Sequence, residues 1–268
     1  MPHTTQSGSR RAFTLAETLV VVACVALLMA IALPTLGRAR GAASSARCTA
    51  NLRQIMAATM AYAAVHEDRY PAAILYHKTS TGIDTEAWDW IQTPGGEVRP
   101  GALWAFADAP AEVLQCPDFH GSSTFGNDPA TGYSYNTTYI GAEGTFPKPV
   151  AGGGWLDGWS TARLGVAGPQ HRRTSQTALF ADAGWKGGAN KFMRAPMNTV
   201  EKNLSTVYAG GVAFRHAGTC NVVYLDGHCA CATVPRRGAL ATDTLLETIM
   251  DFPSNGFLSE DDAAYDPR

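Results

Sequence analysis

The sequence lacks the compact motifs that mark the common classes of hydrolase and nucleotide-binding protein. Neither Gly-x-Ser-x-Gly nor His-Glu-x-x-His occurs, so nothing in the sequence indicates a nucleophilic serine or a catalytic zinc. The run Gly152–Gly154 is not followed by Gly-Lys-Ser or Gly-Lys-Thr, and it therefore predicts a flexible loop rather than a phosphate-binding loop. We expect a protein that is not an enzyme and that carries no cofactor.

The chain also lacks a strong excess of either charge. Its 21 basic and 23 acidic side chains give a formal net charge of −2 over 268 residues. General binding of nucleic acid requires a basic surface, so we expect no nucleic-acid partner. The 27 glycines and 15 prolines favour a loop-rich domain over a helical bundle.

Cysteine is too scarce for a small disulfide scaffold, since the chain contains six. Cys24 lies in an apolar run and is expected to act as a small buried hydrophobic residue. The remaining cysteines fit a domain that faces an oxidising compartment.

The N-terminal region has almost no charge once its first twelve residues have passed. Those residues are polar and then basic, ending in Arg10, Arg11 and Ala12, whereas Phe13–Leu36 contains a single charged residue, Glu17. As a helix at about 1.5 Å per residue this segment spans roughly 36 Å, enough to cross a hydrocarbon core of about 30 Å. A carboxylate in that position is costly and usually has a partner.

These residues resemble a known export signal. The stretch Arg10-Arg11-Ala12-Phe13-Thr14-Leu15-Ala16-Glu17 is similar to the class III signal of type IV pilins and type II secretion pseudopilins. The resemblance implies that a prepilin peptidase cuts between Ala12 and Phe13 and that the new amine of Phe13 is methylated. It further implies that Glu17 pairs with the amine of a neighbouring subunit. The family prefers glycine where this chain has Ala12.

The same resemblance sets the expected partners and location. Arg10 and Arg11 precede the apolar segment while Arg38, Arg40 and Arg47 follow it, so charge counting leaves the topology open. The family pattern implies a single-pass protein of the inner membrane, with a cytoplasmic N-terminus and a periplasmic or extracellular head. Its expected partners are the prepilin peptidase and other pilin or pseudopilin subunits. Pro34 lies where many pilins have a proline, which removes one helix hydrogen bond and permits a kink.

A second helical segment follows the apolar one. Its apolar side chains recur with helical period and form one stripe, made of Cys48, Leu52, Ile55, Met56, Thr59 and Ala63. We expect the helix to continue to about Val65 and to pack on the rest of the chain. Together with the resemblance, this predicts an α+β, pilin-like fold: a long N-terminal helical spine packed on a head with antiparallel sheet and long loops. The expected segments are a leader (1–12), a transmembrane helix (13–36), the outer half of the spine (37–66), the head (67–258) and a flexible acidic tail (259–268).

The head contains strand patterns in its last third, at Thr177–Ala181, Val207–Arg215, Cys220–Leu225 and His228–Val234. Asp226-Gly227 between two apolar runs predicts a two-residue hairpin. That register pairs Leu225 with His228 and Tyr224 with Cys229, and it places Cys220, Cys229 and Cys231 on one face.

A further resemblance rests on residues of the head. His216, with nine residues before Asp226-Gly227, is similar to the His-x9-Asp-Gly signature of large pseudopilin-like proteins abundant in planctomycetes. The strand between them is about 17 Å long, so we expect His216, Asp226 and Gly227 to have structural roles rather than to form one site. Asp226 with His228 lacks the oxygen-rich cluster that calcium needs, and zinc on Cys220, Cys229 and Cys231 lacks a fourth ligand. We therefore expect no bound metal.

Cys48 and Cys116 form the best candidate disulfide. Cys48 lies on the inner stripe of the spine and Cys116 precedes a proline in a loop. A bridge between them would stabilise the fold by roughly 4 kcal/mol in the chain-entropy model. The alternative is a pair of buried free thiols.

Three functions follow from these patterns. The leading one is a structural pseudopilin-like subunit of a type II secretion or type IV pilus-like filament. The second is a membrane-anchored surface module that binds polysaccharide or protein and uses the pilin pathway only for anchoring. Its ligand could stack on tryptophans that otherwise serve as core anchors, namely Trp88, Trp90, Trp104, Trp155 and Trp159. The third is an anchored hydrolase, for which the sequence holds no motif.

Overall fold

The computed structural model describes residues 14–107, 110–144, 148–153, 155–156, 165–197 and 210–268. The chain divides into two compact units, Met1–Ala43 and Ser44–Arg268, and each is described by itself. Ala12 and Phe13, the residues of the expected cleavage site, lie outside the described residues.

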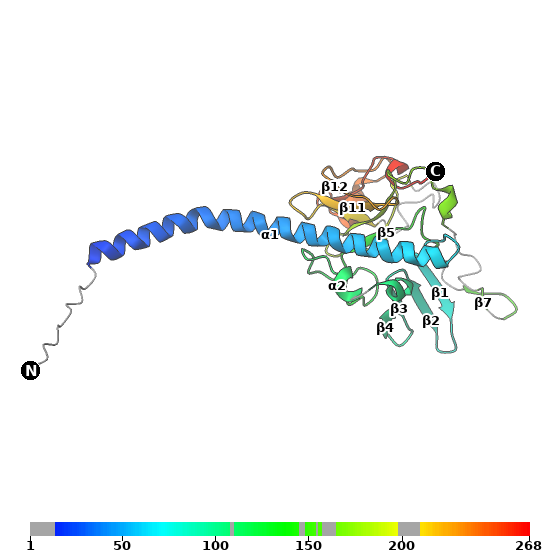
Figure 1. Ribbon diagram of the computed structural model, residues 1–268. Helices are drawn as coiled ribbons and strands as arrows, with labels where there is room; N and C mark the ends of the chain where they lie inside the picture. Colours follow the sequence, from blue (N-terminus) through cyan, green and yellow to red (C-terminus); the bar gives the residue numbers. More distant parts are fainter. Residues whose placement is uncertain (1–13, 108–109, 145–147, 154, 157–164, 198–209) are drawn as a thin grey trace, which may run out of the picture. The chain divides into compact units, whose positions relative to one another are not determined.

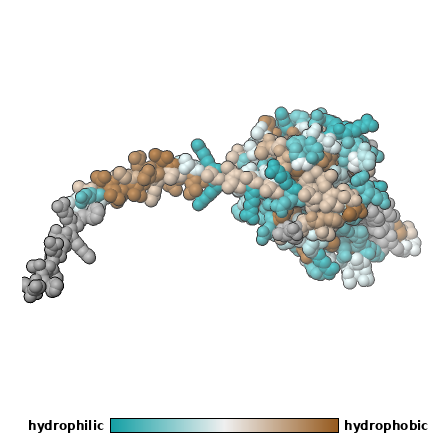
Figure 2. Space-filling model, in the orientation of Figure 1, coloured by the Kyte–Doolittle hydropathy of each residue, from teal (hydrophilic) through white to brown (hydrophobic). Residues whose placement is uncertain are grey.

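The first unit contains the beginning of helix α1, which spans Leu15–Val65 and passes through Pro34 without a break. Its most apolar window has a mean hydropathy of 2.8, and none of that window is buried within the protein. Large side chains such as Leu19 (61% exposed) and Leu28 (67%) face outward, and Figure 2 shows the apolar surface gathered along this part of the helix. Within the described residues, one helix is thus long and apolar enough to cross a membrane.

From Cys48 onward α1 belongs to the second unit and buries one side. The expected stripe is confirmed, because all six of its residues are buried, together with Asn51 and Ala58. The helix ends at Val65, and the following Glu67 and Asp68 take positive φ angles of 55° and 58°, a conformation that cannot continue a right-handed helix. In the view of Figure 1, strands β1–β4 lie on one side of this part of α1 and β11 and β12 on the other.

The larger sheet of the head is built around β8, whose residues are all buried. Its strands run in the order β12-β11-β8-β10-β13, with β5 pairing β8 and β9; all pairs are antiparallel except β5–β9. The bounds are β5 Tyr133–Asn136, β8 Ala178–Gly184, β9 Phe192–Met193, β10 Gly211–Ala213, β11 Cys220–Tyr224, β12 Cys229–Ala232 and β13 Asn255–Gly256.

Two smaller sheets and several short helices complete the described head. The bounds of the four-stranded antiparallel sheet are β1 Ile74–Lys78, β2 Ile83–Ala87, β3 Trp90–Gln92 and β4 Val98–Pro100, and those of the two-stranded sheet are β6 Lys148–Pro149 and β7 Trp155–Leu156. The helices are η1 Ala102–Phe106, α2 Pro110–Leu114, η2 Gly168–Gln170, η3 Leu245–Met250 and η4 Asp262–Ala264. The long N-terminal helix and the sheet-bearing head confirm the α+β fold class.

The hairpin between β11 and β12 differs from the expected register by one residue. Val223, not Tyr224, pairs with Cys229, and the amide of Tyr224 donates to the carbonyl of His228 at 3.0 Å. The loop therefore has three residues and ends at Gly227, whose φ of +87° is the left-handed position typical of a three-residue hairpin. A one-residue shift turns side chains to the other face, so Cys220 does not share a face with Cys229 and Cys231.

The C-terminal residues, expected to form a flexible acidic tail, are instead packed into the head. Tyr265 is fully buried and Asp262 is 9% exposed. The carbonyl of Tyr265 accepts a hydrogen bond from Asn136 Nδ2 at 2.8 Å, and the carbonyl of Pro267 accepts one from the amide of Arg172 at 2.7 Å. Burial of this aromatic ring and pairing of the backbone outweigh the local acidic composition.

Candidate functional site

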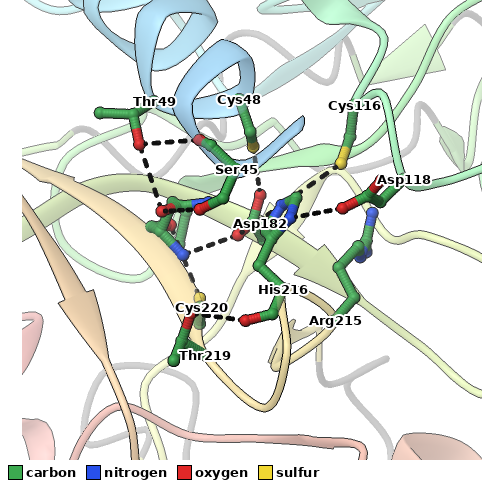
Figure 3. A network of polar contacts seen from close by, with 12 residues as sticks. Ser45, Cys48, Thr49, Cys116, Asp118, Asp182, Arg215, His216, Thr219 and Cys220 are labelled. Atoms are coloured by element: carbon green, nitrogen blue, oxygen red, sulfur yellow. Dashed lines mark hydrogen bonds and ion pairs between the residues drawn. The ribbon is translucent and has the colours of Figure 1, made fainter. Parts of the chain in front are cut away.

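Four buried side chains with metal-binding atoms meet in the second unit. Their Sγ, carboxylate oxygen and imidazole nitrogen atoms all lie within 4.8 Å of one another. We call them the four-residue cluster (Figure 3), and its members are Cys48, Cys116, Asp182 and His216.

Each member comes from a different segment of the chain. Cys48 lies on the buried face of α1, and Cys116 follows α2 in a loop. Asp182 is in the middle of β8 and is fully buried. His216 sits before a tight turn, where Ala217 and Gly218 both have positive φ (53° and 83°) as in the hairpin turns that favour the sheet twist.

The contacts inside the cluster are short. Sγ of Cys48 lies 2.7 Å from Oδ1 of Asp182. Nε2 of His216 lies 3.5 Å from Oδ2 of Asp182 and 3.7 Å from Sγ of Cys116. Figure 3 shows the imidazole between the Cys116 thiol and the Asp182 carboxylate.

Neighbouring polar groups orient the cluster from outside. Nδ1 of His216 lies 2.8 Å from Oδ2 of Asp118, and the same oxygen accepts a hydrogen bond from the Ser44 hydroxyl at 2.5 Å. Oδ2 of Asp182 accepts the backbone amide of Asn221 at 2.6 Å. Both aspartates are therefore held in place by groups that do not belong to the cluster.

The local electrostatics shift the pKa values of the two thiols in opposite directions. A hydrogen bond from Cys48, together with His216 and against the effect of burial, lowers the pKa of Cys116 to about 5. The hydrogen bond to Cys116, together with burial, raises the pKa of Cys48. Burial disfavours the charged imidazole of His216, but its hydrogen bonds to Asp182 and Cys116 outweigh that effect and raise its pKa to about 10.

Comparison with protein-family models, with curated proteins and with solved structures finds no match. The function of this chain must therefore be inferred from its own residues and their arrangement.

The cluster can do three things chemically. Two thiols, an imidazole and a carboxylate can bind a metal ion. Cys48 and Cys116 can also join in a disulfide, although both are free thiols in the structure. Finally, Cys116, His216 and Asp118 lie in the order of a nucleophile, a base and the group that orients the base.

Sequence reasoning found only part of this site. It brought Cys48 and Cys116 together, but it treated His216 as a structural residue and did not find Asp118 or Asp182. The sequence feature that could have indicated the site is Asp182. An acidic residue within the apolar run 178–183 is expected to be buried, and a buried carboxylate needs a hydrogen-bond partner or a bound ion.

Asp226 and Gly227, the other part of the His-x9-Asp-Gly pattern, lie outside the four-residue cluster. Asp226 does not contact His216; its Oδ1 lies 2.6 Å from Nδ1 of His228, and both residues are partly exposed on the hairpin loop. The rings of His228 and Tyr224 stack at 4.4 Å between centroids. Asp226 and His228 therefore pair with each other on the hairpin loop, whereas His216 belongs to the four-residue cluster.

The described start of α1 contains Glu17, the residue that the resemblance assigns to assembly. The carboxylate of Glu17 accepts hydrogen bonds from the amide and the hydroxyl of Thr14, both at 2.8 Å to Oε2. In return the Thr14 hydroxyl accepts the amide of Glu17 at 3.3 Å. This reciprocal pattern is a capping box, which satisfies amide groups that a helix start otherwise leaves unpaired.

Proposed function

We propose that this chain is a structural pseudopilin-like subunit of a type II secretion or type IV pilus-like filament. In this proposal a prepilin peptidase cuts between Ala12 and Phe13, Phe13 is methylated, and the chain is anchored in the inner membrane with its head outside. Subunits then assemble through α1. The observation that carries the proposal is an apolar, outward-facing helix that begins beside the cleavage signal and contains one acid, Glu17.

The exposure of α1 supports a role in assembly. A run of exposed leucines, isoleucines and valines from Leu15 to Leu36 is unfavourable in water and needs lipid or other subunits as its surroundings. In a filament, neighbouring copies of the same helix would cover the same surface that lipid covers before assembly.

The geometry of Glu17 is compatible with a second partner. Within the described residues, the hydrogen bonds of its carboxylate from Thr14 both go to Oε2, and we propose that Oε1 accepts an amine from a neighbouring chain. Opposite charges in a low-dielectric environment strengthen such a contact. The capping box and the proposed intersubunit pair therefore use different oxygens.

The alternative function is a membrane-anchored surface binding module. A pocket near the end of α1 is lined in part by the aromatic side chains of Tyr62, His66 and Tyr70, which a ligand could contact. The expected tryptophan platform gives it less support, because the described side chains of Trp88, Trp90 and Trp104 are 9% exposed or less. Of the other two, Trp159 and the side chain of Trp155 lie outside the described residues.

Mass spectrometry of the mature N-terminus tests the proposal directly. We expect a chain that begins with N-methylated Phe13 and is found in the membrane fraction. A chain that keeps Met1 would contradict the proposed processing. Recovery of the chain in sheared filaments would separate the subunit from the binding module, which would be processed and anchored but absent from filaments.

A further inference from the structure

We propose that Cys48, Cys116, Asp182 and His216 bind a zinc ion that has a structural role. This site is independent of the proposed filament function, because all four residues belong to the unit Ser44–Arg268 and none lies in the apolar part of α1. Two thiolates, one imidazole and one carboxylate are ligands that zinc takes in proteins.

Two separations inside the cluster are close to those around a tetrahedral ion, and all four ligand atoms lie within 4.8 Å of one another. At the tetrahedral angle, bonds of about 2.3 Å to sulfur and about 2.0–2.1 Å to nitrogen and oxygen place neighbouring ligand atoms about 3.3–3.8 Å apart. The imidazole Nε2 of His216 lies 3.7 Å from Sγ of Cys116 and 3.5 Å from Oδ2 of Asp182. Sγ of Cys48 lies 2.7 Å from the other carboxylate oxygen of Asp182, Oδ1. If Oδ1 is the ligand atom, the two would have to separate by about 1 Å to reach this spacing.

The surroundings are those of a bound metal ion rather than of an incidental group. A metal-bound histidine typically donates a hydrogen bond from its other ring N–H to a carboxylate. This hydrogen bond selects the tautomer and fixes the orientation of the ring. The carboxylate of Asp118 is placed to accept this hydrogen bond from Nδ1 of His216. The backbone amide of Asn221 holds the carboxylate of Asp182 in the same way.

Burial makes the site structural rather than catalytic. Cys48, Cys116 and Asp182 have no exposed surface and His216 is 4% exposed. A catalytic zinc keeps one position for water or substrate, whereas a structural zinc has four protein ligands and a closed site. The proposed ion would connect α1, the loop after α2, the centre of β8 and the turn before β11.

A disulfide explains less of the cluster. Joining Cys48 to Cys116 would remove the thiol proton that Oδ1 of the fully buried Asp182 accepts. Only Oδ2 would keep its partners, Asn221 and His216. Loss of a hydrogen bond to a buried carboxylate is costly.

A zinc ion balances the charges of two thiolates, so the four ligands and the ion together carry the single negative charge of Asp182, whose carboxylate is then held by the metal. Arg215 precedes His216 in the chain and lies beside Asp118 in Figure 3, so its positive charge opposes that remaining negative charge.

A catalytic role for Cys116 also explains less. A reactive cysteine has to be reached by its substrate, and Cys116 is 0% exposed. The catalytic order of Cys116, His216 and Asp118 also gives no role to Cys48 and Asp182, whose ligand atoms lie within 4.8 Å of those of Cys116 and His216.

The first test is the metal content of the intact chain. Untagged full-length protein, purified in detergent without chelators, should contain about one zinc per chain by elemental mass spectrometry. Replacing zinc by Co²⁺ should give the visible bands of a tetrahedral ion and a thiolate-to-cobalt charge-transfer band. This measurement uses the wild-type chain and does not depend on the folding of any variant.

The second test uses matched cysteine variants. The double variant Cys48→Ser/Cys116→Ser should lose zinc and the charge-transfer band. The control Cys229→Ser/Cys231→Ser also removes two thiols, one partly exposed and one exposed. It should retain both the zinc and the charge-transfer band.

Four results would overturn the proposal. The first is equal zinc content in the two double variants. The second is a metal-free chain that gives no charge-transfer band with Co²⁺. The third is a non-reducing peptide map in which most chains carry a Cys48–Cys116 disulfide. The fourth is rapid alkylation of Cys116 in the folded wild type that is lost in His216→Gln, which would identify a reactive thiolate–imidazole pair instead.

Discussion

Nδ1 of His216 lies 2.8 Å from Oδ2 of Asp118, and this contact turns the opposite ring nitrogen, Nε2, toward Cys116. The chain contains a second pair of the same type, in which Asp226 Oδ1 lies 2.6 Å from Nδ1 of His228. The first pair is attached to the four-residue cluster and the second is partly exposed on a hairpin loop. The two pairs therefore make a matched comparison.

Asp118→Asn should weaken zinc binding without removing a ligand. Loss of the carboxylate that orients a metal-bound histidine typically lowers affinity about 10–100-fold, and competition with a chromogenic chelator measures that change. Asp226→Asn is the control and should leave the affinity unchanged. Equal affinities for Asp118→Asn and the wild type would show that Asp118 does not position His216.

The charge of Glu17 can be separated from its role at the helix start. Glu17→Gln keeps a side chain that completes a capping box but has no charge to pair with a neighbour's amine. We expect both Glu17→Gln and Glu17→Ala to insert into the membrane and both to be lost from filaments. The amounts in sheared filaments and in the membrane fraction, compared by immunoblot, measure this.

Thr14→Ala is the converse variant, because it removes the hydroxyl of the capping box and retains the charge. It should weaken the helix start by about 1 kcal/mol while still allowing incorporation into filaments. Normal incorporation of Glu17→Gln would show that assembly does not need the carboxylate charge.

Two methionines one helical turn apart test how α1 packs on the head. Met56 is 6% exposed and Met60 is 47% exposed. Met56→Ala should lower the free energy of unfolding by about 2–5 kcal/mol because it leaves a cavity in the core, whereas Met60→Ala should change it by less than about 1 kcal/mol. Urea unfolding of the detergent-solubilised chain, followed by tryptophan fluorescence, compares them; similar losses would mean that this face of α1 is not buried.

A buried charged group in the head predicts a pH dependence of stability. Nζ of Lys191 lies 2.6 Å from Asp89 Oδ1 and 2.8 Å from Asp128 Oδ2, and all three side chains are at most 5% exposed. Burial raises the pKa of Asp89 to about 6, with Lys191 opposing and Asp128 adding to the shift. Two carboxylates share one cation, so the second negative charge is disfavoured.

The direction of the change in stability with pH follows from proton binding by Asp89. Because the folded chain holds the Asp89 proton to a higher pH than the unfolded chain does, this stabilisation is present below about pH 4 and is lost as the pH rises through about 6. Relative to Asp89→Asn, the wild type should lose on the order of 2 kcal/mol of unfolding free energy between pH 4 and 7. Parallel pH profiles of the two proteins would contradict the raised pKa.

Much of the fold could be read from local patterns. The period of Cys48, Leu52 and Ile55 predicts which side of α1 is buried, since residues three and four apart share a helix face. The absence of charge from Leu19 to Leu33 predicts the apolar helix for the same local reason. The hairpin between β11 and β12 could be located from Asp226-Gly227, but its register could not, because two-residue and three-residue loops both end on a glycine with positive φ.

The sequence by itself determined the continuous apolar helix and the buried stripe, because each depends on residues within a few turns of one another. Only the tertiary structure decided that Cys48 and Cys116 meet Asp182 and His216, that Asp118 orients the imidazole, and that Tyr265 is in the core. Those contacts join segments far apart in the chain, and their geometry depends on strand register and turn conformation, which the whole packed head sets together.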